Sequence, residues 1–162
     1  MLDAWHARAA TPLAELVKQR DGWRAAGHRV VLTNGCFDIL HPGHVALLEA
    51  ACREGDRLIV AINSDSSVAR LKGAGRPLVP EAERAEALRA LESVDTVVIY
   101  DDETPIEVVR ALRPDVLVKG ADWPEDAIVG RTEVEQDGGR VVRVALVPGR
   151  STSAILARIR RP

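Results

Sequence analysis

Short apolar runs and longer segments of helical periodicity alternate along most of this chain. Runs rich in valine, isoleucine and leucine are typical of strands buried in parallel sheets, and they predict strands at residues 30–33, 57–63, 96–100, 116–118 and 140–147. Segments with apolar residues three or four positions apart predict helices at residues 13–27, 45–55, 66–72, 81–94, 105–113, 125–136 and 154–160. We expect Thr11 to cap the first of these helices and Thr104 to cap the fifth. The alternation predicts an α/β fold with an open, mostly parallel sheet of about five strands flanked by helices.

The composition indicates one globular domain over residues 1–162, with a loosely ordered start at residues 1–10. Hydrophobic residues make up 46% and charged residues 28%, which is ordinary for such a domain. The 22 Lys and Arg residues are balanced by 24 Asp and Glu residues, so we expect a free nucleotide rather than nucleic acid as the partner. No apolar run is long enough to span a bilayer and the first residues lack the pattern of a leader, which predicts a cytoplasmic protein with no membrane partner. Cys36 and Cys52 follow no metal-ligand spacing and are expected to be reduced thiols.

The stretch from residue 30 to residue 44 carries the strongest chemical signal. It is predicted to form a buried strand, a turn at Asn34 and Gly35, and a helix whose first turn carries His41 and His44. The start of a helix has unpaired N–H groups and the positive end of the helix dipole, and two imidazoles would add further donors for an anion. We therefore predict a phosphate site, the alternative being a polar helix cap with two solvated histidines. The chain has neither a G-x-G-x-x-G nor a G-x-x-x-x-G-K-S/T motif, which argues against a dinucleotide redox site and a P-loop.

Other polar residues also follow predicted strands. Ligands of open parallel sheets bind outside the carboxyl ends of the strands, and Asn63, Asp122 and Ser151 all lie there with the histidine stretch. Thr152 and Ser153 begin the last helix and offer a second helix start for phosphate. We expect one crevice to collect all of these residues.

The histidine stretch resembles the G-x-F-D-x-x-H-x-G-H signature of the cytidylyltransferase-like nucleotidyltransferases. The matching residues are Gly35, Phe37, Asp38, His41, Gly43 and His44. The resemblance implies a Rossmann-like nucleotidyltransferase fold in which the two histidines contact nucleotide phosphates.

Three further segments are similar to the bacterial D-glycero-β-D-manno-heptose 1-phosphate adenylyltransferases. They are residues 70–84, 117–123 and 149–156, and the likeness runs from about residue 13 to residue 159. It implies transfer of AMP from ATP to the sugar 1-phosphate, giving ADP-heptose and pyrophosphate, with Mg²⁺ bound through the triphosphate and no metal held by the protein's own side chains. In many relatives this domain is fused to a sugar kinase, and we expect the present chain to be the stand-alone form. The resemblance also implies a homodimer, for which the apolar helix face at residues 85–91 is a candidate contact.

The resemblance assigns roles residue by residue. His41, His44, Lys72 and Arg84 are the implied catalytic residues, with Lys72 reaching the phosphates or the sugar phosphate from a mobile loop. The implied nucleotide-binding residues are Asn34, Gly35, Phe37, Gly43, Asp122, Ser151, Thr152 and Ser153. The implied substrate-binding residues are Asp38, Asn63 and Lys72.

Several of these residues have a simpler explanation. Lys72 fits an exposed loop lysine as well, and Arg84 fits an ion pair with Glu81 on the same helix face. Asp122 fits a turn before a proline, and Ser151 fits a helix N-cap that has no ligand.

The segment before the last helix departs from a related family. Glycerol-3-phosphate cytidylyltransferases carry R-T-x-G-I-S there, and this chain has Leu146 in place of the Arg and Arg150 in place of the Ile. The difference favours ATP over CTP. The alternatives are a cytidylyltransferase acting on a polyol phosphate such as glycerol 3-phosphate, and a nucleotide-binding module without turnover.

Overall fold

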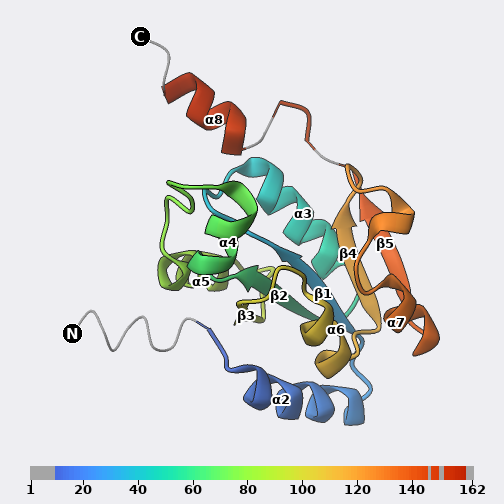
Figure 1. The fold of residues 1–162 in the computed structure, drawn as a ribbon. Helices are drawn as coiled ribbons and strands as arrows, with labels where there is room; N and C mark the ends of the chain where they lie inside the picture. Colours follow the sequence, from blue (N-terminus) through green and yellow to red (C-terminus); the bar gives the residue numbers. More distant parts are fainter. Residues whose placement is uncertain (1–9, 146, 150–151, 160–162) are drawn as a thin grey trace.

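The computed structural model describes residues 10–145, 147–149 and 152–159, so nearly all of the predicted loose start lies outside the described residues. Its helices are α2 (Leu13–Ala25), α3 (Pro42–Cys52), α4 (Asp65–Lys72), α5 (Glu81–Arg89), α6 (Ile106–Leu112), α7 (Arg131–Gln136) and α8 (Thr152–Ile159), with a short 3-10 helix η1 (Glu125–Ala127). Its strands are β1 (Val30–Gly35), β2 (Arg57–Asn63), β3 (Thr96–Tyr100), β4 (Val116–Gly120) and β5 (Arg140–Val144). Figure 1 shows these elements in their spatial order.

The five strands form one sheet in which every neighbouring pair is parallel, in the order β3-β2-β1-β4-β5. The predicted α/β fold is therefore confirmed, and the sheet is entirely rather than mostly parallel. The strand order reverses between β1 and β4, which is where open parallel sheets bind their ligands. The predicted turn at Asn34 and Gly35 was wrong, because these residues continue β1 and pair with Ala61 and Ile62 of β2.

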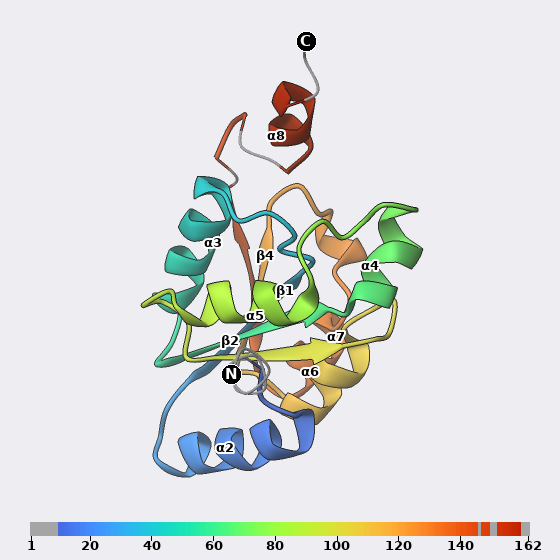
Figure 2. The same cartoon turned by 90° about the vertical axis from the view of Figure 1, so that its left-hand side faces the viewer.

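Helices cover both faces of the sheet (Figures 1 and 2). Leu48 of α3 and Leu88 of α5 belong to the apolar cluster on one face, and Leu16 of α2 belongs to the cluster on the other. Successive residues of β1 alternate between the clusters, with Val31 in the first and Leu32 in the second. The strands are almost continuously apolar because both faces of the sheet are buried.

Aspartate carboxylates fix the amino-terminal edge of the sheet. Oδ2 of Asp115 accepts the backbone N–H of Val30 at 2.8 Å, and Oδ2 of Asp95 accepts that of Leu58 at 2.8 Å. These are amides that the sheet ladder leaves without a partner at the start of each strand. The amino-terminal edge of the sheet is therefore occupied by structural contacts, and ligands of such sheets bind at the opposite, carboxyl-terminal edge.

Some local predictions differ from the structure. Thr11 does not cap α2, because its hydroxyl pairs with that of Thr96 at 2.9 Å, and Thr104 does not cap α6, which begins after Pro105. The helix predicted over residues 125–136 is interrupted at Gly130, whose φ of 90° lies outside the helical region. The helix predicted over residues 66–72 is confirmed as α4, so Lys72 lies in its last turn and not in the loop that follows.

Two predictions concerned the outside of the molecule. Of the helix face proposed as a dimer contact, Ala85 and Leu88 are fully buried against the sheet and are not available to a partner, whereas Leu91 is half-buried. Among the residues that the structure describes, no helix has both the length and the apolar character that a bilayer-spanning segment requires.

Gly139 should not tolerate a side chain. A Cβ there would lie 2.7 Å from the carbonyl oxygen of Asp115 and 2.7 Å from the side chain of Val134. We expect Gly139→Ala to lower the free energy of unfolding by about 1–3 kcal/mol through overpacking. Urea unfolding followed by circular dichroism measures the change.

Gly22 provides the matched control, because a Cβ on this residue of α2 would meet nothing within 4 Å. Gly22→Ala should raise the free energy of unfolding by about 0.5–1 kcal/mol by improving helix propensity. Equal stability of Gly139→Ala and the parent would contradict the close packing of β5 on α7.

Candidate functional site

Two adjoining cavities open at the carboxyl ends of β1 and β4. The first, of about 320 Å³, is called here the histidine lobe, and the residues lining it alone are His41, Gly43, Leu47, Gly120, Asp122 and Val147. The second, of about 450 Å³, is called the arginine lobe, and its own lining includes Asp38, Asn63, Leu71, Arg76, Tyr100 and Glu103. The shared boundary consists of Asn34, Gly35, Cys36, Phe37, His44, Lys72, Lys119, Trp123 and Thr152. One continuous crevice therefore collects most of the predicted site residues.

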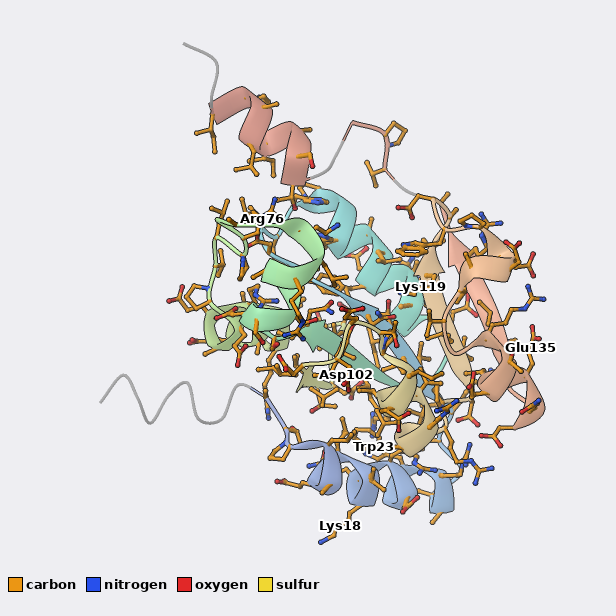
Figure 3. All side chains as sticks on the ribbon, viewed as in Figure 1. Lys18, Trp23, Arg76, Asp102, Lys119 and Glu135 are labelled. Carbon is orange, nitrogen blue, oxygen red and sulfur yellow. The ribbon has the colours of Figure 1, made fainter. Side chains whose placement is uncertain are left out.

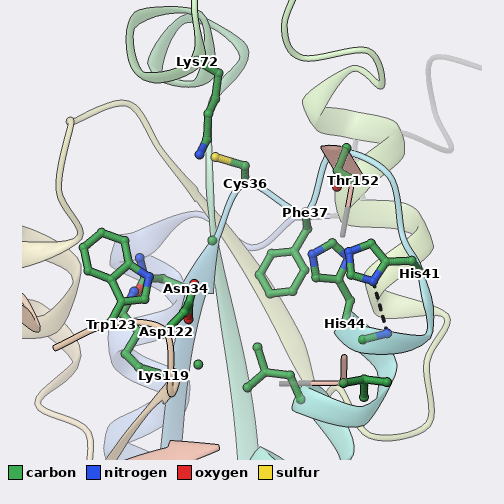
Figure 4. Close-up of a pocket in the computed structure, with 15 residues that line it drawn as sticks. Asn34, Cys36, Phe37, His41, His44, Lys72, Lys119, Asp122, Trp123 and Thr152 are labelled. Atoms are coloured by element: carbon green, nitrogen blue, oxygen red, sulfur yellow. Dashed lines mark hydrogen bonds between the residues drawn. The ribbon is translucent and has the colours of Figure 1, made fainter. Parts of the chain in front are cut away.

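The two histidines stack at the start of α3 (Figure 4). His41 is the N-cap residue of α3, and its Nδ1 accepts the backbone N–H of Gly43 at 3.1 Å. A nitrogen that accepts a hydrogen bond carries no hydrogen, so in the neutral ring the hydrogen is on Nε2. The ring of His44 stacks on it, with the ring planes inclined by 21° and the centroids 3.8 Å apart. The helix start therefore presents an imidazole donor beside its backbone amides.

His44 is held in its neutral form. Burial and, to a smaller extent, the neighbouring His41 ring lower its pKa to about 4, although a hydrogen bond with the backbone of Ile39 acts in the opposite sense. Its Nδ1 is buried and has no hydrogen-bond partner among the described residues. A neutral ring with an unpaired buried nitrogen is suited to a polar ligand, because such a group is costly to leave unsatisfied.

Phe37 supports the histidine pair from the end of β1. Its ring centroid lies 4.9 Å from that of His44, and its φ of 48° is unusual for a residue with a side chain. Gly35 leaves room for this arrangement, since a Cβ there would lie 3.1 Å from the Phe37 ring. The strained turn directs the ring of Phe37 back against the histidine pair.

Two lysines face the boundary between the lobes. Lys72 reaches it from the last turn of α4, and Figure 4 shows its ammonium beside the Cys36 thiol. Lys119, at the end of β4, is 8% exposed, and burial lowers its pKa to about 8. Its ammonium lies 5.4 Å from the centroid of the Trp123 ring. Both cations are placed to meet a polyanion that occupies the crevice.

Asp38 does not face the crevice as a free ligand. Its Oδ1 accepts the backbone N–H groups of Leu78 and Val79 at 2.7 and 2.9 Å, and its Oδ2 accepts Nε of Arg76 at 2.6 Å. Burial alone would raise the pKa of Asp38, but these hydrogen bonds together lower it below its ordinary value. The carboxylate therefore anchors the loop between α4 and α5, and the predicted substrate-binding role of Asp38 stays a prediction.

Arg84 is also a structural residue in this geometry. Its side chain is fully buried and lines neither lobe, and all three guanidinium nitrogens are bonded, to the carbonyls of Val79 and Cys36 and to Asp65. The implied catalytic role of Arg84 stays a prediction, while the alternative ion pair with Glu81 is replaced, among the described residues, by one with Asp65. The carboxylate of Glu81 instead accepts the backbone N–H of Asp65.

The remaining predicted residues lie in the crevice or outside the described residues. Asn34 donates to the Tyr100 hydroxyl at 3.2 Å, and Asn63 donates to the hydroxyl of Ser67 at 3.0 Å. The other predicted lining residues are Asp122, Thr152 and Ser153. Ser151 lies outside the described residues, as do Leu146 and Arg150 on which the comparison with CTP-using enzymes depended.

The sequence interpretation missed several lining residues. The clearest is Lys119, a charged residue at the end of an otherwise apolar strand, in a segment quoted only for its resemblance. Cys36, whose thiol pKa is raised by burial, and Tyr100 were also missed. A lysine within a strand that is otherwise apolar is unusual, and this could have indicated from the sequence that Lys119 has a functional role.

The arrangement is suited to holding phosphates and stabilising charge as it moves between them. Donors converge from the start of α3 and from the two lysines, in a partly enclosed site where such interactions are stronger than in water. Within the described ranges, no group of three or more His, Cys, Asp or Glu side chains could hold a metal ion. The crevice itself is lined by imidazoles and ammonium groups that can stabilise negative charge.

Comparisons with known proteins agree with this geometry. A family model described as cytidylyltransferase-like matches residues 32–152. The bifunctional protein HldE of Acidiphilium cryptum is 58% identical over 138 residues, which cover 85% of this chain and 28% of that protein. HldE of Gluconobacter oxydans is 53% identical over 148 residues, covering 91% of this chain and 31% of that protein. The chain thus spans about 30% of the length of these relatives.

A solved structure is similar over most of the chain. It is a lipopolysaccharide core biosynthesis protein from Thermoplasma volcanium, with a TM-score of 0.61 and 28% sequence identity. The match covers 75% of this chain and 98% of that one.

Acidic pH should destabilise the protein partly through His44. Its native pKa of about 4 lies below the ordinary value of 6.5, so below about pH 6.5 the unfolded chain binds a proton that the native ring excludes. Stability from this ring is present above about pH 6.5 and is lost as the pH falls toward 4. Urea unfolding between about pH 7 and pH 4.5 should show a smaller loss for His44→Gln than for the parent.

Lys72→Gln is the control for this titration, because it alters the same crevice without removing an imidazole. Its unfolding free energy should fall with pH as steeply as that of the parent. A His44→Gln protein with the parent's full pH dependence would show that this ring is not buried in its neutral form.

Substitutions of Arg84 and of Lys72 should affect different properties, the first the stability of the protein and the second its binding of nucleotide. Arg84→Gln removes hydrogen bonds from a fully buried guanidinium and should lower the free energy of unfolding by about 2–4 kcal/mol. Lys72→Gln should change stability by less than about 0.5 kcal/mol, because Lys72 is exposed, and should weaken nucleotide binding. Urea unfolding and calorimetric titration with ATP measure the two effects. Normal stability with lost ATP binding in Arg84→Gln would restore the triphosphate contact for Arg84.

Proposed function

The chain belongs to the cytidylyltransferase-like family of nucleotidyltransferases, and from this premise we propose that it is an adenylyltransferase. The proposed reaction is transfer of AMP from ATP to D-glycero-β-D-manno-heptose 1-phosphate, giving ADP-heptose and pyrophosphate. The observation that carries the proposal is the stacked His41 and His44 pair at the start of α3, beside a boundary that carries Lys72 and Lys119.

The histidine lobe is the proposed site of the nucleotide. The triphosphate would lie against the first turn of α3, where His41 Nε2–H and the backbone amides donate to its oxygens. Trp123, 48% exposed at the rim, offers a flat apolar surface to the base, and Asp122 beside it offers acceptors to the ribose hydroxyls. The arginine lobe would then receive the sugar phosphate from the other side of the boundary.

The chemistry follows from this placement. An oxygen of the sugar phosphate forms a bond to the α-phosphorus, the bond from that phosphorus to the bridging oxygen breaks, and pyrophosphate leaves with the electron pair. The attacking phosphate is already ionised at neutral pH, so no general base is needed. Lys72, Lys119 and His44 lie at the boundary where negative charge is greatest, and they would stabilise the transition state. Mg²⁺, bound through triphosphate oxygens, would supply further neutralisation.

The choice of ATP and a heptose phosphate is supported by likeness. The HldE relatives are more than 50% identical to this chain, and the motif segments resemble heptose 1-phosphate adenylyltransferases. The similar solved structure is named for lipopolysaccharide core biosynthesis. We extend the proposal to a homodimer acting in the cytoplasm, where ATP is available, on small-molecule substrates and without nucleic acid.

A nucleotide panel tests the proposal. Pyrophosphate release should be fastest with ATP and heptose 1-phosphate when ATP, CTP, GTP and UTP are each paired with heptose 1-phosphate and with glycerol 3-phosphate. His41→Ala should lower kcat by roughly 10²–10³-fold, the effect of losing one transition-state donor. Preference for CTP with glycerol 3-phosphate would support the cytidylyltransferase alternative. Nucleotide binding with no pyrophosphate from any pair would support a module without turnover.

A further inference from the structure

Arg76 has an unusual position in the loop between α4 and α5. The loop leaves α4 through Gly73 and Gly75, whose φ angles of 90° and 84° suit glycine. Arg76, labelled in Figure 3, follows on this loop and lines the arginine lobe. The Arg76 side chain is 20% exposed, so most of it is enclosed although it belongs to a surface loop. The loop therefore places an arginine inside the crevice.

Asp38 accepts a hydrogen bond from one nitrogen of the Arg76 guanidinium, Nε. The Asp38 side chain is 1% exposed, and its Oδ2 accepts Nε of Arg76 at 2.6 Å while Oδ1 is occupied by the amides of Leu78 and Val79. An arginine paired with a carboxylate often uses two parallel N–H groups. Here, within the part of the chain that the structure describes, no partner is recorded for Nη1 or Nη2.

Arg84 gives an internal comparison. It is bonded through Nε, Nη1 and Nη2 to protein acceptors and lines neither lobe. Arg76 is bonded through Nε alone and lines the arginine lobe. The contrast distinguishes a guanidinium whose donors are all used by the fold from one that is oriented by the fold and keeps its fork of donors for a ligand.

The position of Arg76 selects the ligand. It lines the arginine lobe but not the histidine lobe, so it lies on the side of the boundary away from His41. Lys72 lies between them, lining both lobes. The two terminal N–H groups of a guanidinium can donate two parallel hydrogen bonds, which match two oxygens of a phosphate monoester.

We propose that Arg76 binds the phosphate of the acceptor substrate through its two terminal nitrogens, and that Asp38 is the positioning residue that sets the orientation of the fork. The inference rests on the proposed function, since it requires a second, phosphorylated substrate. It assigns recognition of the acceptor phosphate to the loop between α4 and α5, and recognition of the triphosphate to the start of α3.

The test is a separation of Michaelis constants in the full-length protein. Arg76→Ala should raise the KM for heptose 1-phosphate by roughly 10–100-fold, the effect of losing a charge-assisted pair of hydrogen bonds, and should change the KM for ATP by less than about threefold. Arg76→Lys keeps the charge but loses the fork, and should recover only part of the loss. If the panel identifies glycerol 3-phosphate as the acceptor, the same constants are measured with that ester.

Two further measurements separate binding from support of the loop. Millimolar guanidinium chloride should restore acceptor use in Arg76→Ala, because the ion can occupy the vacated position. Arg70→Ala is the matched control, since Arg70 lies on α4, pairs with Asp101 and lines neither lobe, and it should show the parent's constants with no response to guanidinium.

The outcomes are distinct. An active parent together with an Arg76→Ala protein of unchanged acceptor KM would overturn this inference alone. So would equal increases in both constants without rescue, which is the behaviour of a residue that only supports the loop. A parent that releases no pyrophosphate with any phosphate ester would overturn the proposed function and this inference together.

Discussion

The turn that follows β1 is the constraint on which the site depends. Phe37 has a φ of 48°, a conformation that is unfavourable for a residue with a side chain and must be held by its surroundings. Arg84 donates to the carbonyl of Cys36 at 2.6 Å on one side of Phe37, and Asp38 on the other side accepts three N–H donors from the loop after α4. These two buried charges fix the backbone before and after the strained residue. The ring of Phe37 is thereby held against His44, and the histidine pair is fixed at the start of α3.

The charged residues that hold the turn are paired within the fold, and this has an electrostatic consequence. Asp38 is compensated by Arg76 and two amides, and Arg84 by Asp65 and two carbonyls, so neither brings an uncompensated charge to the ligand site. Two of the groups that face the crevice are shifted by burial, which lowers the pKa of His44 to about 4 and the pKa of Lys119 to about 8. Because both groups are poorly solvated, an anionic ligand would supply interactions that water does not.

The periodicity of the sequence was sufficient to predict the sheet, because strands buried on both faces are recognisable as apolar runs. The histidine pair was also predictable, because both histidines lie within one short stretch of sequence at the start of a helix. The roles of Asp38 and Arg84 were not predictable, because their partners Val79 and Cys36 lie 41 and 48 positions away in the sequence. Spacing within one helix suggested Glu81 for Arg84, whereas the fold brings Asp65 of another helix to it. Lys72 was expected in a loop because of the glycines that follow, yet α4 continues until Gly73.

The division of the crevice into two lobes addresses the main difficulty of the proposed reaction, which is that both substrates are anions. Two unit charges about 4 Å apart repel by about 4 kcal/mol at an effective dielectric constant near 20, so the approach of a sugar phosphate to a triphosphate is opposed unless cations lie between them. Lys72 and Lys119 line both lobes, whereas His41 and Arg76 each line one. The shared cations would act on both anions at their point of closest approach, and the unshared groups would hold each anion at its far side. A site that placed all its positive groups around the triphosphate would bind ATP tightly but would leave the repulsion at the reacting atoms uncompensated, so the distribution of charge favours transfer over binding alone.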